Sequence, residues 1–142
     1  MDLGADSHTM SMTGRAVAAP LPGLDATRCR RVAYVALLPS LLVSAHPDYV
    51  LTHRLEPLAP DATRITCEWL ALPGTTSDDL APAVELWDIT NRQDWEACAS
   101  VQRGVASPWF VPGPLAPRED AVHNVVSWFA SAYLAGAGED AR

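Results

Sequence analysis

The sequence has little positive charge and no long uninterrupted hydrophobic run. Ten Lys and Arg side chains stand against seventeen Asp and Glu side chains, which gives a net charge of −7. No basic run is interleaved with aromatic residues to grip phosphates, so we expect no nucleic acid partner. The longest apolar run, Val32–Val43, is interrupted by Pro39 and Ser40 and is too short to cross a bilayer as a helix. The first residues lack the positive start and apolar stretch of a secretory leader, so we expect a cytoplasmic protein without a membrane partner.

Several motifs that carry chemistry are also missing. The three cysteines, Cys29, Cys67 and Cys98, are an odd number at wide spacing, which indicates reduced thiols. None of them has a second Cys or a His two or three residues away, so the usual zinc and iron–sulfur signatures are excluded. The sequence contains no Gly-x-Ser-x-Gly and no glycine-rich phosphate loop, and therefore gives hydrolase and nucleotide-binding functions no support.

The composition is that of a packed globular protein. Hydrophobic residues make up 49% and charged residues 19% of the 142 residues, a length that suits about one domain. Glycine and proline are frequent up to Leu24, and apolar periodicity is weak there. We therefore expect an irregular arm over residues 1–24, one domain over residues 25–136 and a loose tail over residues 137–142.

Four segments rich in Val, Leu, Ile, Tyr, Thr and Trp follow one another with short turns between them. This pattern predicts four strands in an antiparallel meander. In the last segment apolar and polar residues alternate, as they do in a sheet with one covered face. The predicted strands are Arg30–Leu38, Leu41–Ala45, Tyr49–Glu56 and Thr63–Leu72.

Two helices are predicted after the strands. The first begins near Asp79 and is closed by Gly104, and we expect it to cover the sheet. The proline-rich connector Ser107–Pro117 cannot be helical. The second helix runs from about Arg118 to Leu134. The predicted fold class is α+β, an antiparallel sheet with a long C-terminal helix packed across it.

One face of the first predicted helix combines a carboxylate with apolar residues. Spacings of four, three and four residues place four side chains on this face, namely Trp87, Asn91, Asp94 and Cys98. A buried carboxylate costs several kcal/mol unless it is paired or binds a metal, so Asp94 needs a partner. The spacing alone favours an ion pair with Arg92 or Arg103, or a capping amide, over a metal ion.

Histidines offer a second set of candidate metal ligands. Two of the four histidines together with Asp94 would make the two-histidine, one-carboxylate site of non-haem iron enzymes. His46 and His53 are seven residues apart and therefore have opposite parity along the strands. His8 falls in the arm and His123 on the flank of the second helix. We therefore expect no such triad within this chain.

A family resemblance rests on the same helix. Asn91–Trp95, followed by Gln102–Gly104, resembles the motif with the carboxylate ligand in the large α subunit of Rieske-type aromatic ring-hydroxylating oxygenases. The similarity extends from about Met10 to Leu134. Four further segments resemble landmarks of that family, namely Leu38–Asp48, Arg54–Pro60, Glu85–Asp88 and Pro112–Leu115.

The resemblance implies a fold, a reaction and a set of partners. The family's catalytic domain is similar to the helix-grip fold, and this chain would hold part of it over residues 25–136. A Rieske [2Fe-2S] cluster passes electrons to a mononuclear Fe(II), which activates O2 to oxidise an aromatic ring or another small organic molecule. Asp94 would be the carboxylate ligand, with Trp87, Asn91, Cys98 and Gln102 lining the pocket. Family partners are homotrimeric α subunits with a ferredoxin or an NAD(P)H reductase, and sometimes a β subunit.

The chain departs from that family in its other ligands. The cluster motifs, Cys-x-His and a later Cys-x-x-His, have no counterpart, and neither do the two iron-binding histidines. Because such a site needs three protein ligands, we expect a fragment that binds no [2Fe-2S] cluster and is inactive alone. The fragment would be a remnant of a broken reading frame, or a second chain would complete its site.

Two other functions stay open. The sheet and long helix could form a non-catalytic module that encloses a small ligand, or a protein that pairs its sheet with a full-length oxygenase. The sequence does not specify the substrate, or whether one or two oxygen atoms are transferred.

Overall fold

The computed structural model describes residues 1–139, with side chains up to residue 136. These residues fall into two compact units, Met1–Val105 and a second unit that begins at Ala106. The elements in chain order are η1 (Arg28–Arg30), β1 (Ala33–Leu37), β2 (Leu41–Ala45), β3 (Val50–Ala59), β4 (Ala62–Leu70), α1 (Ser77–Val105) and α2 (Asp120–Glu139).

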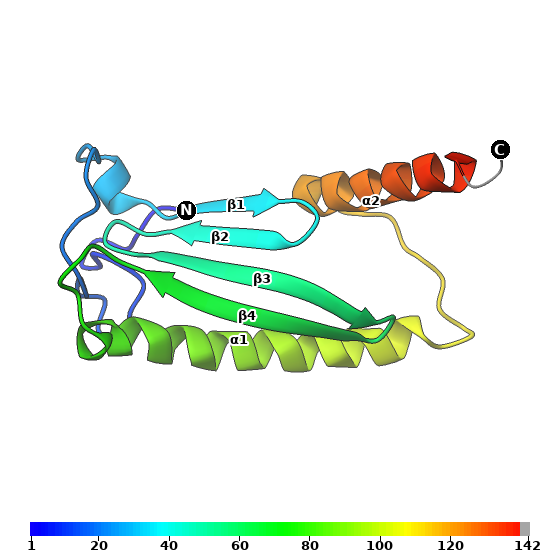
Figure 1. Ribbon diagram of the computed structural model, residues 1–142. Coiled ribbons are helices and arrows are strands. Elements are labelled where there is room, and N and C mark those ends of the chain that lie inside the picture. The colour runs from blue at the N-terminus through cyan, green and yellow to red at the C-terminus, as the bar shows by residue number, and fades with distance from the viewer. Residues whose placement is uncertain (140–142) are drawn as a thin grey trace. The chain divides into compact units, whose positions relative to one another are not determined.

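The four strands form one antiparallel sheet in the order β1-β2-β3-β4, as the turn pattern predicted (Figure 1). The β3–β4 pair is the longest, and its register is irregular only between Pro57 and Ala59. Leu51 lies opposite Trp69 in this pair. His53 lies opposite Cys67. Because side chains alternate across a sheet, these four residues share one face.

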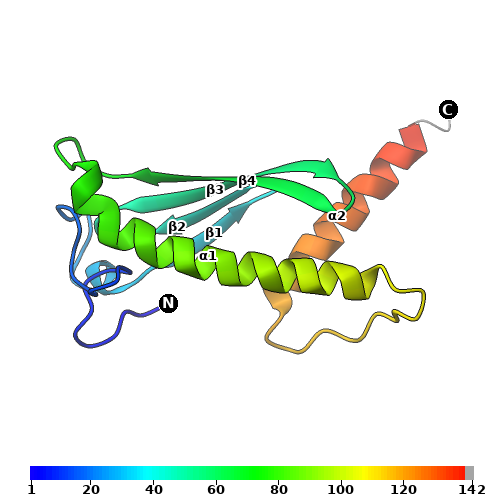
Figure 2. The same cartoon turned by 90° about the horizontal axis from the view of Figure 1, so that it is seen from below.

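The long helix α1 packs against that face (Figure 2). Its start is fixed by a capping interaction, in which the Asp79 carboxylate accepts hydrogen bonds from the Thr76 amide (2.9 Å) and hydroxyl (2.6 Å). These bonds hold the pKa of Asp79 below its ordinary value. Gly104 does not close the helix as predicted, since α1 continues to Val105 and Gly104 does not have a positive φ. The sheet and the long helix confirm the α+β class.

The core lies between the sheet and the first half of α1. Its buried members are Tyr49, Leu51, Ala83 and Trp87. The irregular N-terminal arm contributes to it, because Met10 and Val17 pack against these residues. Asp48, which is 1% exposed, holds the arm in place by accepting hydrogen bonds from the Thr9 hydroxyl (2.6 Å) and the Val17 amide (2.7 Å).

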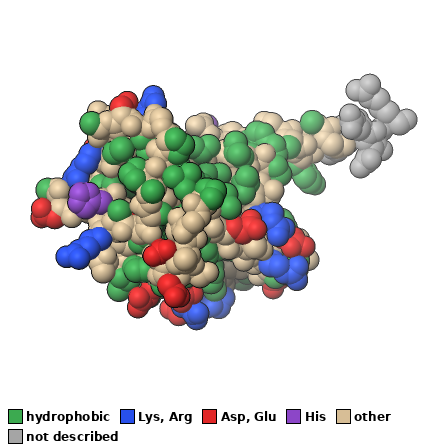
Figure 3. All heavy atoms as spheres, turned by 60° about the vertical axis from the view of Figure 1, so that its left-hand side comes forward, with side chains coloured by type: hydrophobic (Ala, Val, Ile, Leu, Met, Phe, Trp, Pro, Cys, Tyr) green, Lys and Arg blue, Asp and Glu red, His purple; other side chains and the backbone are tan. Residues whose placement is uncertain are grey.

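The edge strand β1 is exposed within the first unit. All five residues of β1 are exposed, among them Tyr34, Val35 and Leu37. Hydrophobic side chains gather over the centre of the face drawn in Figure 3, with charged side chains toward its margin. An exposed strand edge of this kind is open to further strand pairing.

The second unit consists of the proline-rich connector and α2. Residues of the connector form neither helix nor strand, as predicted. Helix α2 ends at Glu139 and not near Leu134, so it includes the first residues of the predicted tail, whereas residues 140–142 lie outside the described residues. Over residues 1–139, neither helix combines the length and the apolar character that a membrane span requires.

Candidate functional site

The predicted face of α1 is divided along its length. Trp87 and Asn91, in the first half, are 8% and 7% exposed and pack toward the sheet. Cys98 and Gln102, in the second half, line a cavity. Asp94 lies between the two regions and is exposed. The helix therefore passes from a packed region to an open one at the turn that carries the carboxylate.

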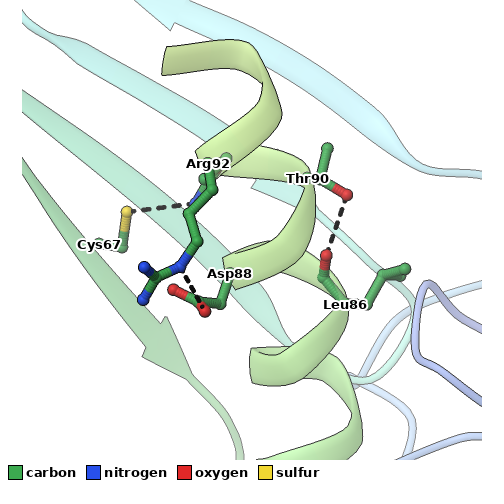
Figure 4. Close-up of polar contacts among 6 residues, drawn as sticks. Cys67, Leu86, Asp88, Thr90 and Arg92 are labelled. Atoms are coloured by element: carbon green, nitrogen blue, oxygen red, sulfur yellow. Dashed lines mark hydrogen bonds and ion pairs between the residues drawn. The ribbon is translucent and has the colours of Figure 1, made fainter. Parts of the chain in front are cut away.

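Asp94 has no ion pair among the described residues. Arg92, one of the partners favoured by spacing, instead pairs with Asp88 at 2.8 Å (Figure 4). Arg103, the other candidate, forms no ion pair in residues 1–139. The burial argument for Asp94 was wrong, because the residue is exposed and its carboxylate therefore needs no buried partner. Its oxygens are thus free to accept a ligand.

A polar bridge joins α1 to the sheet one turn before Asp94. The Asn91 side-chain oxygen lies 3.2 Å from His53 Nε2, and the Asn91 amide nitrogen donates to the Cys67 thiol at 3.7 Å. His53 also meets the Trp87 ring edge-on at 6.0 Å between centroids. Burial raises the pKa of Cys67, which keeps its thiol protonated and a poor nucleophile. This bridge therefore positions α1 and does not form a nucleophilic site.

His46 belongs to the core. It is 2% exposed, stacks on Tyr49 with 4.1 Å between centroids, and meets Trp87 edge-on at 5.7 Å. Neither ring nitrogen has a hydrogen-bond partner within residues 1–139. Burial lowers the pKa of His46 to about 4, against the opposing effect of Asp48, so the ring is neutral at pH 7.

The described residues do not fit a complete mononuclear iron site. No group of three or more His, Cys, Asp or Glu side chains in residues 1–139 is arranged to hold a metal ion. His8 lies exposed in the arm, and His123 lies on α2 in the second unit. In this part of the chain Asp94 therefore belongs to no set of three such ligands.

The cavity beside the second half of α1 has a volume of about 650 Å³. Figure 2 shows α1 and the strands diverging toward this end. One wall is the β3–β4 hairpin and the other is α1, and the lining residues are Pro60, Asp61, Ala62, Thr63, Ile65, Trp95, Cys98, Ala99 and Gln102. This volume is in the range of small-molecule pockets, which are about 300–1,000 Å³.

The sequence indicated only part of this site. Cys98 and Gln102 were named as pocket residues, and both line the cavity. Trp95 was named only as the end of the motif Asn91–Trp95, but it also lines the cavity and is 41% exposed. Asp61 was not singled out, and His53 was considered only as a metal ligand. For its contact with α1 a usable signal existed, since His53 lies two residues after the apolar Leu51 in the same predicted strand and so shares its face.

Comparisons with known proteins agree with the residue pattern. The sequence model of the family described as "Ring hydroxylating alpha subunit (catalytic domain)" matches residues 1–135. The chain is 32% identical over 98 residues to the glycine betaine monooxygenase oxygenase subunit of Pseudomonas aeruginosa, a match that covers 66% of the chain and 23% of the relative. The protein of the same name from Chromohalobacter salexigens is 32% identical over 92 residues, or 61% of the chain and 20% of the relative. The chain thus spans about a quarter or less of the length of these relatives.

Proposed function

Because the chain belongs to the family of ring-hydroxylating oxygenase α subunits, in the region of their catalytic domain, we propose that it supplies one part of a non-haem iron oxygenase centre. Asp94 is the carboxylate ligand in this proposal. The observation that carries it is an exposed aspartate without an ion pair among the described residues, within the motif Asn91–Trp95 and beside a cavity of about 650 Å³.

The family is one of Rieske non-haem iron oxygenases, in which a [2Fe-2S] cluster and a mononuclear iron are expected. When bound, the iron supplies the activation of O2. A two-histidine, one-carboxylate site needs three protein ligands, and this chain supplies one of them. The proposal therefore assigns the two histidines and the cluster ligands to residues outside these 142. Without them the chain is expected to be inactive.

The chain's own residues would fix where the carboxylate stands. Asn91 and Trp87 hold the first half of α1 against the sheet, through the bridge to His53 and Cys67 and through the core. Asp94 follows Asn91 by less than one turn, so its position is set by this packed region. Trp87 and Asn91 are thus positioning residues in this proposal, since they act on the ligand through the helix.

The substrate would enter the cavity beside Asp94. Cys98 lies one turn after Asp94 on α1 and lines the cavity with Gln102. A substrate in the cavity would therefore lie beside the face of α1 that carries the Asp94 carboxylate. The substrate is thus a small organic molecule, aromatic or not. The relatives named as monooxygenases favour transfer of one oxygen atom.

Electrons would come from a partner protein. Oxygenase α subunits of this family work with other subunits and with electron-transfer proteins. We propose a ferredoxin or an NAD(P)H reductase as the donor and a trimer of α subunits as the assembly. Both need the complete α subunit, because the cluster that receives the electrons has no ligand motif in this chain.

A chimera tests the assignment of Asp94. The corresponding segment of the P. aeruginosa subunit is replaced by residues 1–135 of this chain, which match the family model and include Asp94, and iron per subunit and substrate-dependent O2 uptake are measured. We expect Asp94→Ala to lower iron content and O2 uptake at least tenfold. Glu96→Gln, an exposed carboxylate two residues away, is the matched control and should retain both. A folded chimera that keeps its iron after Asp94→Ala would contradict the proposal.

A non-catalytic ligand-binding module is the second candidate. The incomplete ligand set and the preformed cavity favour it. In that case the Asp94→Ala chain would keep its affinity for a cavity ligand, and the chimera would bind no iron with or without Asp94. The two functions therefore differ in whether any measured property depends on the Asp94 carboxylate.

A further inference from the structure

The second half of α1 has no buried residue. Asn91 is 7% exposed, whereas every residue from Arg92 to Val105 is exposed. Among the described residues, the hydrogen bonds of Asn91 are also the last ones that join α1 to the sheet. The direction of the exposed half, which carries Asp94 and the helical wall of the cavity, is therefore set at Asn91.

Asn91 is held from two neighbouring strands at once. His53 on β3 and Cys67 on β4 lie opposite each other in the strand register. The Asn91 side chain meets His53 Nε2 at 3.2 Å and Cys67 Sγ at 3.7 Å. The thiol is the weaker partner, because sulfur is a poor hydrogen-bond acceptor. A rotation of α1 about its axis would therefore be resisted mainly by the contact with His53.

The direction of these hydrogen bonds assigns a proton to His53. The Asn91 amide nitrogen donates to Cys67, so the Asn91 side-chain oxygen faces His53. An amide oxygen only accepts hydrogen bonds, and His53 must therefore donate to it from a protonated Nε2. A glutamine at position 53 could donate in the same way through its amide nitrogen, whereas a leucine could not.

A small rotation of α1 is a large displacement for a metal ligand. Side-chain atoms lie about 5–6 Å from the axis of a helix, so a rotation of about 10° moves a carboxylate by about 1 Å. Metal–ligand distances hold to within about 0.2 Å. Asp94 follows Asn91 by about 4.5 Å along the axis, at about 1.5 Å per residue, and would share a rotation that begins there.

We propose that His53 is a positioning residue, which donates from Nε2 to Asn91 and thereby fixes the rotation of the exposed half of α1. His53 is not a metal ligand in this inference, and it acts on Asp94 through the helix. Its effect on iron rests on the proposed function, whereas its effect on the helix does not require iron.

Amide hydrogen exchange in the full chain without iron tests the effect on the helix. In His53→Leu we expect the Asp94 and Trp95 amides to exchange about fivefold faster relative to the Trp87 amide, the effect of losing one hydrogen bond. The Trp87 amide is the internal reference that separates a local opening from a loss of global stability. His53→Gln should restore the ratio to within about twofold of the unsubstituted chain. His8→Leu, at an exposed histidine of the arm, is the matched control and should leave it unchanged.

Metal binding in the chimera tests the link from His53 to Asp94. His53→Leu should weaken iron binding about tenfold, the lower end of the effect of residues that orient a metal ligand. It should also shift the visible absorption of the cobalt(II)-loaded chimera, which reports the geometry of the ligands. His53→Gln should restore both, and it decides the matter if His53→Leu does not fold.

The outcomes separate this inference from the proposed function. Unchanged exchange in His53→Leu, or a His53→Gln chain that behaves like His53→Leu, would overturn the positioning role of His53. Iron affinity that survives His53→Leu but not Asp94→Ala would overturn the effect of His53 on the metal and leave the proposed function intact. Iron retained after Asp94→Ala would refute the proposed function, while the exchange rates would still decide whether His53 fixes the helix.

Discussion

The Tyr49 hydroxyl joins three separate parts of the first unit. It donates to the Met10 carbonyl oxygen at 2.6 Å and accepts from Trp87 Nε1 at 2.8 Å. Tyr49 itself is 0% exposed. One oxygen atom thus connects the N-terminal arm, the residue before β3 and helix α1. Tyr49→Phe removes this atom and leaves the ring in place.

The cost of Tyr49→Phe follows from the two partners left behind. The Trp87 ring nitrogen and the Met10 carbonyl oxygen lie against the core and lose the hydroxyl that paired them. A buried polar group without a partner costs about 1–3 kcal/mol, so we expect a loss of about 2–4 kcal/mol in the free energy of unfolding. Burial raises the pKa of Tyr49 above its ordinary value, so the hydroxyl remains a donor at any pH up to the usual tyrosine range.

Urea unfolding of the full chain, followed by circular dichroism, measures this loss. Tyr34→Phe is the control, because Tyr34 is 50% exposed and its hydroxyl donates to the weak acceptor Met10 Sδ at 3.2 Å. It should cost less than about 0.5 kcal/mol, as exposed substitutions usually do. A double-mutant cycle with Trp87→Phe should show coupling of about 1 kcal/mol or more. A Tyr49→Phe protein no less stable than Tyr34→Phe would refute the reasoning.

Two further predictions concern buried polar groups. Burial lowers the pKa of His46 to about 4 in the folded chain, against about 6.5 when unfolded, so the free energy of unfolding should fall by at most about 3 kcal/mol as pH drops from about 6.5 to about 4. In urea unfolding at several pH values, His46→Phe should remove this pH dependence and the control His8→Phe should keep it. An unchanged pH dependence in His46→Phe would contradict the prediction. Asp48→Asn should release the N-terminal arm, because an amide group cannot accept all the hydrogen bonds that the carboxylate accepts from the Thr9 hydroxyl and two backbone amides. We expect a loss of about 2–3 kcal/mol in the free energy of unfolding and faster limited proteolysis within the arm. A cleavage rate equal to that of the control Asp25→Asn would argue against this role of Asp48.

The fold was largely predictable because its signals are local. Short apolar segments with turns between them gave the meander, and strands that follow one another through short turns pair with their neighbours. The helical spacing from Trp87 to Cys98 placed these residues on one face of α1. The predicted C-terminal ends of the helices were wrong, since α1 ends at Val105 and not at Gly104, and α2 ends at Glu139 and not near Leu134. Fraying and the choice of a terminal residue depend on small differences in free energy.

The environment of each site residue could not be predicted in the same way. Helical spacing gives the direction of Asp94 around the helix axis, but whether that direction meets protein or water depends on how far α1 stays in contact with the sheet. The sequence therefore predicted a buried carboxylate where the structure has an exposed one.

The sequence by itself determined the order of the elements and the family, since these depend on patterns within a few residues and on motif identity. Only the tertiary structure brought Asp61 to the same cavity as Trp95, and His53 to Asn91. These pairs join residues more than thirty positions apart, and such contacts depend on strand register and on the angle between sheet and helix. Those two quantities follow from the packing of the whole core, which no short segment specifies.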